Sequence, residues 1–142
     1  MDNERALTVM VVDQHKEVCA VLARSLERLP GIDVLGHATN LMLAAEVAHR
    51  LSPDVIVADF VWGEATRADI LRWFGRMSPY SRLVVYSSYF RDGERESFEA
   101  AGATRCLLKG MNVKDLGAEL RKVHQVPRDV DERRGNHNKQ GK

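Results

Sequence analysis

The sequence contains little of what marks several large classes of protein. Its 142 residues include only two cysteines, four prolines and 6% aromatic residues. Cys19 and Cys106 lie in apolar stretches without CxxC spacing or paired histidines, so the sequence offers no pattern for a disulfide framework or a cysteine metal site. Both are predicted to be small core residues, and a reducing compartment is the natural setting for them.

Charge of one sign is also scarce, because 21 basic residues are balanced by 20 acidic ones and the formal net charge is +1. This balance gives no strong field for holding a nucleic-acid backbone or a lipid surface, so we expect no direct nucleic-acid binding. No apolar run approaches the roughly 20 residues of a membrane-spanning helix, and the polar start MDNERAL lacks a secretory pattern. The prediction is a soluble cytoplasmic protein without membrane association.

The composition is otherwise that of an ordinary globular protein, with 44% apolar and 29% charged residues. A chain of this length is long enough for one core and too short for two ordinary domains. Within residues 127–142 only Val130 is apolar, and glycine and asparagine are frequent. We therefore predict one domain over residues 1–126, followed by a flexible polar tail or linker over residues 127–142.

Short apolar runs alternate with segments of helical spacing along the chain. The runs, rich in β-branched residues, predict strands at 7–12, 32–35, 55–58, 83–86 and 105–108. Apolar residues at intervals of three and four predict helices around 18–29, 43–51, 70–77 and 113–123, with a weakly patterned one at 94–101. Asn112 and the pair Asp92-Gly93 are candidate helix starts. Strict alternation predicts an α/β fold, with a five-stranded parallel sheet covered by helices on both faces.

The residues that follow the strands have the polar side chains that matter for chemistry. In an open parallel sheet, ligands bind outside the carboxyl ends of the strands. Asp13 follows the first predicted strand, Asp59 the third, Ser87 the fourth and Lys109 the fifth. Two acids, a hydroxyl and a cation are the groups that suit transfer of a phosphoryl group onto a carboxylate, with a small hard cation held by the acids.

Four segments in this order resemble the landmarks of response-regulator receiver domains: VVDQH, PDVIVADF, LVVYSS and GATRCLLKG. The resemblance covers about residues 7 to 125. The stretch HATNLMLAAEVAHRLSPDVIVAD is most similar to receivers that precede helix-turn-helix output domains. The fold implied is the flavodoxin-like (βα)5 receiver fold. The function implied is a phosphorylation-controlled switch of a two-component or phosphorelay system, which catalyses only its own phosphorylation and dephosphorylation.

The resemblance also assigns roles to residues. Asp59 is the implied phosphorylation site, and its donor would be a phosphohistidine on a sensor histidine kinase or a phosphotransfer protein. Mg²⁺ is the implied cofactor, held by Asp13 and Asp59, weakly by Gln14 and by the backbone carbonyl of Val61. Lys109 would pair with Asp59 or its phosphate. Ser87, in preference to Ser88, would bond a phosphate oxygen in the active state.

Several positions depart from the family pattern. Receivers usually have a second acid where this chain has Gln14, a switching aromatic residue where it has Cys106, and a proline where it has Gly110. Gln14, Cys106 and the altered loop after Asp59, Phe60-Val61-Trp62-Gly63, leave open an alternative, a receiver-fold interaction module that works without phosphorylation. The sequence has no GxxxxGK or GxGxxG motif to support a metabolic enzyme. The downstream partner, a missing output domain and a homodimer also stay open.

Overall fold

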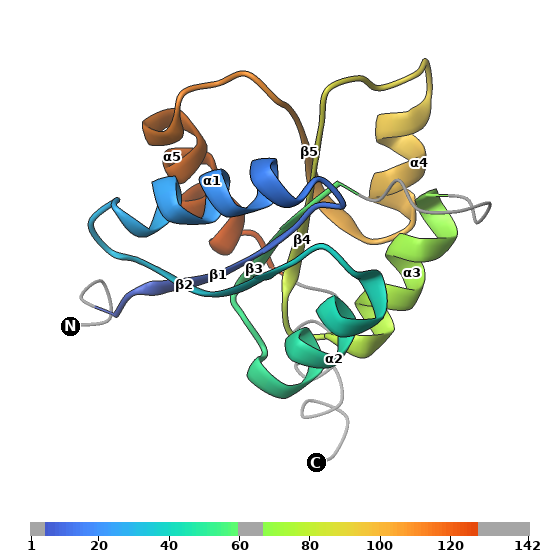
Figure 1. Cartoon of the computed structure of the whole chain (residues 1–142). Coiled ribbons are helices and arrows are strands. Elements are labelled where there is room, and N and C mark those ends of the chain that lie inside the picture. The colour runs from blue at the N-terminus through green and yellow to red at the C-terminus, as the bar shows by residue number, and fades with distance from the viewer. Residues whose placement is uncertain (1–4, 60–66, 128–142) are drawn as a thin grey trace, which may run out of the picture.

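The chain folds into a three-layer α/β domain, seen in the computed structural model of Figure 1, which describes residues 5–59 and 67–127. Strands and helices alternate throughout. In chain order they are β1 (Leu7–Val12), α1 (Lys16–Glu27), β2 (Ile32–Ala38), α2 (Leu41–Leu51), β3 (Val55–Ala58), α3 (Arg67–Met77), β4 (Arg82–Ser87), α4 (Glu94–Ala100), β5 (Ala103–Leu108) and α5 (Val113–His124).

The five strands form one parallel sheet in the order β2-β1-β3-β4-β5. The helices α1 and α5 cover one face, and α2, α3 and α4 cover the other (Figure 1). β1, β3 and β4 are buried on both faces, which explains their nearly continuous apolar sequences. The predicted fold class is confirmed.

β2 differs from its prediction, because it extends to Ala38 and does not stop at Leu35. It lies at the edge of the sheet, where a residue needs only one strand neighbour and polar side chains reach solvent. Its pairing with β1 shifts between Val9–Val34 and Met10–Gly36, so Leu35 is the extra residue of a bulge. Gly36 and His37 interrupt the apolar run, and for this reason the apolar pattern predicted an earlier end of the strand.

The ends of two helices match their sequence signals. Asn112 caps α5, because its side-chain oxygen accepts a hydrogen bond from the backbone N–H of Asp115 at 2.9 Å. Gly93 precedes α4 with a φ of 82°, a left-handed conformation that favours glycine. Both predicted helix starts are confirmed.

Each face of the sheet has its own apolar layer, and each layer buries one of the two cysteines. Cys19 packs with α1 and α5, and Cys106 packs under α3 and α4. Burial raises the pKa of the Cys106 thiol to about 11, so it stays protonated at neutral pH. The prediction that both are core residues is confirmed.

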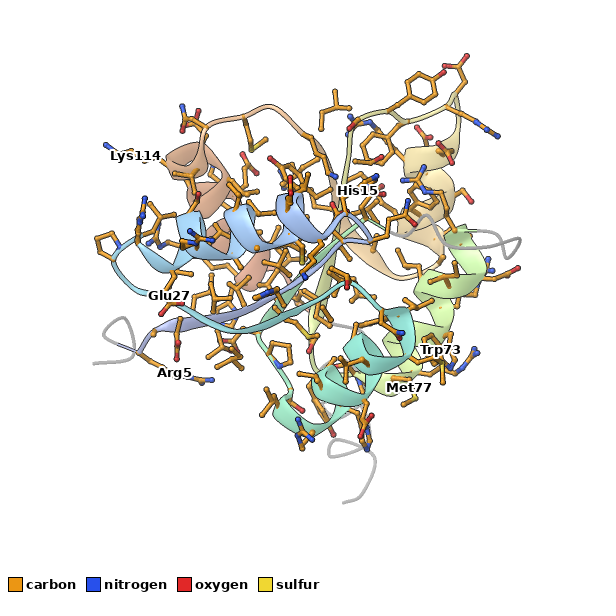
Figure 2. The ribbon with its side chains drawn as sticks, viewed as in Figure 1. Arg5, His15, Glu27, Trp73, Met77 and Lys114 are labelled. Atoms are coloured by element: carbon orange, nitrogen blue, oxygen red, sulfur yellow. The ribbon has the colours of Figure 1, made fainter. Side chains whose placement is uncertain are left out.

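Trp73 and Met77 lie on the side of α3 that faces α2 (Figure 2), where they border a surface groove with Met42 and Leu43. Trp73 packs partly buried against the core and meets Phe74 edge to face, with ring centroids 5.9 Å apart.

Within residues 5–59 and 67–127, no helix is long and apolar enough to cross a membrane. The predicted tail lies outside the described residues except for Pro127.

Candidate functional site

The sheet ladder fixes the backbone of the four predicted site residues. The N–H of Asp13 donates to the carbonyl of Ala38 at 3.1 Å, and the N–H of Asp59 donates to the carbonyl of Val12 at 3.0 Å. The N–H of Lys109 donates to the carbonyl of Ser87 at 2.8 Å. These bonds continue the strand pairing by one residue. Asp13, Asp59 and Lys109 each come directly after a strand, and Ser87 is the last residue of β4, so all four lie at the carboxyl edge of the sheet.

Lys109 joins the two predicted acids. Its ammonium nitrogen lies 2.7 Å from Asp13 Oδ2 and 3.1 Å from Asp59 Oδ2. The three side chains are mostly withdrawn from water, with 20%, 4% and 13% of their surface exposed for Lys109, Asp13 and Asp59. Charge-assisted hydrogen bonds in such surroundings are short and strong. Residues far apart in the sequence thus form one charged cluster.

Asp13 is the most buried member of this cluster. Burial alone would raise the pKa of its carboxyl group, but the hydrogen bond from Lys109 and the backbone N–H of His15 lower it, and the net pKa lies below the usual value. The pKa of Lys109 is raised, since its bonds to Asp13 and Asp59 outweigh the lowering caused by burial. Both groups are therefore held in their charged forms at neutral pH.

His15 contacts the same carboxylate from the start of α1. Its backbone N–H donates to Asp13 Oδ1 at 2.9 Å, and its ring Nδ1 lies 3.1 Å from the same oxygen. Figure 2 shows His15 where β1 runs into α1. With Lys109 on Oδ2, both oxygens of Asp13 have hydrogen-bond partners.

Asp59 has a different environment, because its two oxygens are not equally paired. Among residues 5–59 and 67–127, buried Asp59 Oδ1 has no hydrogen-bond partner, and the Nη2 of Arg67 lies 3.7 Å from it. The Nη1 of Arg67 also lies 3.4 Å from Glu94 Oε2. Sequence reasoning missed both Arg67 and Glu94. Each is the first residue of a helix, and the signal available was that α3 and α4 begin at the same sheet edge as Asp59.

The other predicted site residues have different environments. Ser87 is buried, and its hydroxyl lies 3.1 Å from the carbonyl of Tyr89 and 3.4 Å from the Tyr89 nitrogen, so it bonds its own loop and not Asp59. Ser88 and Gln14 are exposed. The predicted ligand Val61 lies outside the described residues.

A pocket of about 590 Å³ opens beside Asp59 at this edge. It is lined by Asp59, Arg67, Ala68, Ser87, Ser88, Tyr89, Arg91, Glu94, Ser97 and Phe98. The lining includes two cations, Arg67 and Arg91, several hydroxyl groups, and the two acids Asp59 and Glu94. Such a pocket suits a small, multiply charged anion.

The donor set at Asp13 and Asp59 also suits a small hard cation. Mg²⁺ typically takes one or two carboxylates and keeps several waters. Two carboxylates that share one ammonium group, with one carboxylate oxygen lacking a hydrogen bond, meet that need. In the part of the chain that the structure describes, no group of three His, Cys, Asp or Glu residues could hold a metal ion. An ion here would rely on two side-chain ligands.

Comparison with known proteins identifies the family. The model of the response regulator receiver domain matches residues 9–121. The chain belongs to the response regulator receiver family. This match spans all four predicted site residues, and the receiver is accordingly a signalling domain of the two-component type.

Relatives and solved structures agree with this assignment. The receiver is 26% identical over 118 residues to the response regulator protein VraR of Staphylococcus saprophyticus and 28% identical over 126 residues to the nitrate/nitrite response regulator protein NarL of Escherichia coli. These matches cover 83% and 89% of this chain but 56% and 57% of the relatives, so the chain spans about half their length. The response regulator domain of Thermotoga maritima CheB superposes with a TM-score of 0.74 at 23% identity, covering 87% of this chain and 99% of that one.

Proposed function

We propose that this receiver accepts a phosphoryl group on Asp59 from a histidine kinase or a phosphotransfer protein. The observation that carries the proposal is the ammonium group of Lys109, which bridges Asp13 and Asp59 at 2.7 and 3.1 Å. A cation held there can stabilise negative charge that develops on Asp59 during transfer. The pocket beside Asp59 offers room for the incoming group.

Each residue of the site has a separate role in the proposed phosphoryl transfer. Asp59 supplies the attacking oxygen, forming a bond to phosphorus while the donor's phosphorus–nitrogen bond breaks. Lys109 holds the product charge, and Ser87 exchanges its bonds with Tyr89 for one to a phosphate oxygen. Mg²⁺ held by Asp13 and Asp59, weakly assisted by Gln14 and the Val61 carbonyl, would neutralise the phosphoryl oxygens. Later hydrolysis at Asp59 resets the switch.

The wider context belongs to the same proposal. The receiver acts in the cytoplasm, with residues 1–126 as the signalling unit and residues 127–142 as a tail or linker. Its output passes to a downstream protein or to an output domain. The similarity to NarL and VraR supports a regulatory role.

A second candidate is an interaction module that works without phosphorylation. The exposed Gln14, in place of a second acid, is the observation that favours it. Lys109 already satisfies one oxygen of each acid, so the cluster is held together without an added cation.

Phosphate incorporation separates the two candidates. Wild type and Asp59→Asn are incubated with acetyl phosphate and Mg²⁺, and hydroxylamine-sensitive phosphate is measured. We expect label on wild type and none on Asp59→Asn, with the circular dichroism spectrum unchanged. Asp33→Asn, which alters an exposed acid on β2, should label like wild type. Absence of label on wild type would favour the interaction module, and label on Asp59→Asn would refute the assignment of Asp59.

A further inference from the structure

A second cation, Arg67, lies near the oxygen of Asp59 that Lys109 does not bond. Lys109 takes Oδ2, and the Nη2 of Arg67 is 3.7 Å from Oδ1. This separation is too long for a hydrogen bond but close enough for an ion pair. The Arg67 side chain is 20% exposed, so water screens the pair only in part.

The guanidinium group has unused hydrogen-bonding capacity on one edge. Nε and Nη2 of Arg67 are buried without hydrogen-bond partners, and the facing Asp59 Oδ1 is the only other such side-chain atom in the described residues. Buried polar groups are rarely left unpaired, because each unpaired group loses its hydration without gaining a partner. The N–H groups of Nε and Nη2 point the same way and form a fork that matches two oxygens of a phosphate. The unpaired groups are thus those that a phosphoryl group would engage.

Two contacts hold this fork in place without using it. Glu94 Oε2 accepts from the remaining nitrogen, Nη1, at 3.4 Å, and its other oxygen accepts from the backbone N–H of Arg91 at 2.7 Å. The guanidinium carbon lies 4.8 Å from the ring centroid of Phe98, a cation–π contact. These contacts come from α4, which lies next to α3 on the same face of the sheet (Figure 1).

The charges around Asp59 also favour a group with more negative charge than a carboxylate. Converting Asp59 into an acyl phosphate replaces one negative charge by about two. Lys109 is shared with Asp13, whereas the unpaired edge of Arg67 faces Asp59. Glu94 neutralises Arg67 only through the opposite nitrogen. The added charge would thus meet a cation with free donors.

We propose that Arg67 is a second phosphoryl-binding residue of this site, with Glu94 as the residue that positions it. The proposal rests on phosphorylation of Asp59. As the bond from Asp59 to phosphorus forms and the bond to the donor's leaving group breaks, Arg67 donates from Nε and Nη2 to two phosphoryl oxygens. It loses no proton, and the negative charge stays on the phosphoryl group.

The test compares phosphorylation rates of wild type, Arg67→Gln and Arg67→Lys with acetyl phosphate and Mg²⁺. Arg67→Gln should be slowed about tenfold, which corresponds to about 1.4 kcal/mol of transition-state stabilisation. Arg67→Lys keeps the charge but not the fork and should fall between the two. Arg72→Gln is the matched control, because it removes the same charge from an exposed pair with Asp69 on the same helix. It should keep the wild-type rate.

Glu94→Gln tests the positioning role, because it keeps an acceptor for Arg91 but weakens the hold on Arg67. Alone it should slow labelling about threefold, and added to Arg67→Gln it should have no further effect. Equal rates for Arg67→Gln and Arg72→Gln would overturn the inference, as would an additive double variant. Failure to label wild type would instead refute the proposed function. Circular dichroism and the urea midpoint show whether each variant is folded.

Discussion

The two edges of the sheet differ in how completely their polar groups are hydrogen-bonded. At the amino edge, Asp54 Oδ2 accepts from the backbone N–H of Thr8 at 2.9 Å, and the Thr8 hydroxyl accepts from the backbone N–H of Asp54 at 2.8 Å. Ser78 and Ser81 bond each other and nearby carbonyls, and Arg82 donates to the carbonyl of Val126. At the carboxyl edge, Asp59 and Arg67 keep buried atoms without hydrogen bonds.

The difference indicates separate tasks for the two edges. The hydrogen-bonded polar groups at the amino edge connect neighbouring strand ends and stabilise the fold. Unpaired groups at the carboxyl edge cost stability in the resting state, and a bound group would recover that cost. Within residues 5–59 and 67–127, the buried side-chain atoms without partners all lie at the carboxyl edge.

The largest effect on stability should come from removing the cation that the two acids share. Lys109→Met leaves Asp13 and Asp59 without their common partner. Loss of one partner of a fully buried pair costs about 3–5 kcal/mol, and because Lys109 is 20% exposed we expect about 2–3 kcal/mol. Urea unfolding at pH 7 in EDTA measures it. Lys122→Met removes an exposed lysine paired with Glu119 and should change stability by less than about 1 kcal/mol.

The stability difference between wild type and Lys109→Met should also depend on pH. Since the pKa of Asp13 is lowered in the fold, the stability it adds is present above about pH 4 and is lost as pH falls through its folded pKa. Since the pKa of Lys109 is raised, its contribution is present below about pH 10 and is lost as pH rises through its folded pKa. The difference between wild type and Lys109→Met should therefore shrink toward both extremes. A difference that is constant from pH 3 to pH 11 would show that the charges do not cause it.

At the amino edge, Asp54→Ala should lower the free energy of unfolding by about 2 kcal/mol, because the Thr8 N–H loses its acceptor. The phosphorylation rate should not change, since Asp54 lies at the far end of β3 from Asp59. Asp33→Ala removes an exposed acid on β2 and serves as the control. A slower phosphorylation rate in Asp54→Ala at unchanged stability would contradict the separation of tasks.

The sequence predicted much of this arrangement because short-range patterns determine it. The alternation of apolar runs with helical patterns predicted the succession of strands and helices along the chain. Asp13, Asp59 and Lys109 follow strand ends, which a parallel sheet brings together at one edge. Arg67 and Glu94 were missed because their meeting depends on how α3 packs beside α4, which no local pattern encodes. The end of β2 was missed because an edge strand needs no continuous apolar run.

The smallest expected effect concerns Gln14, where an acid would add one negative charge beside the proposed Mg²⁺ ligands. Most of that gain is cancelled by repulsion within the acidic cluster and by lost hydration. If about 1.4 kcal/mol remains, Gln14→Asp tightens Mg²⁺ binding roughly tenfold. Calorimetric Mg²⁺ titration at equal ionic strength tests this. Equal dissociation constants would mean that residue 14 does not contribute to the cation site.

The central claim, that the unpaired carboxyl edge exists to hold a phosphoryl group on Asp59, has a direct chemical readout. Borohydride reduces an aspartyl phosphate to homoserine, which peptide mass spectrometry locates. Wild type treated with acetyl phosphate and Mg²⁺ should yield homoserine at residue 59 and at no other acid. Homoserine at a different acid, or none in fully folded protein, would contradict the account.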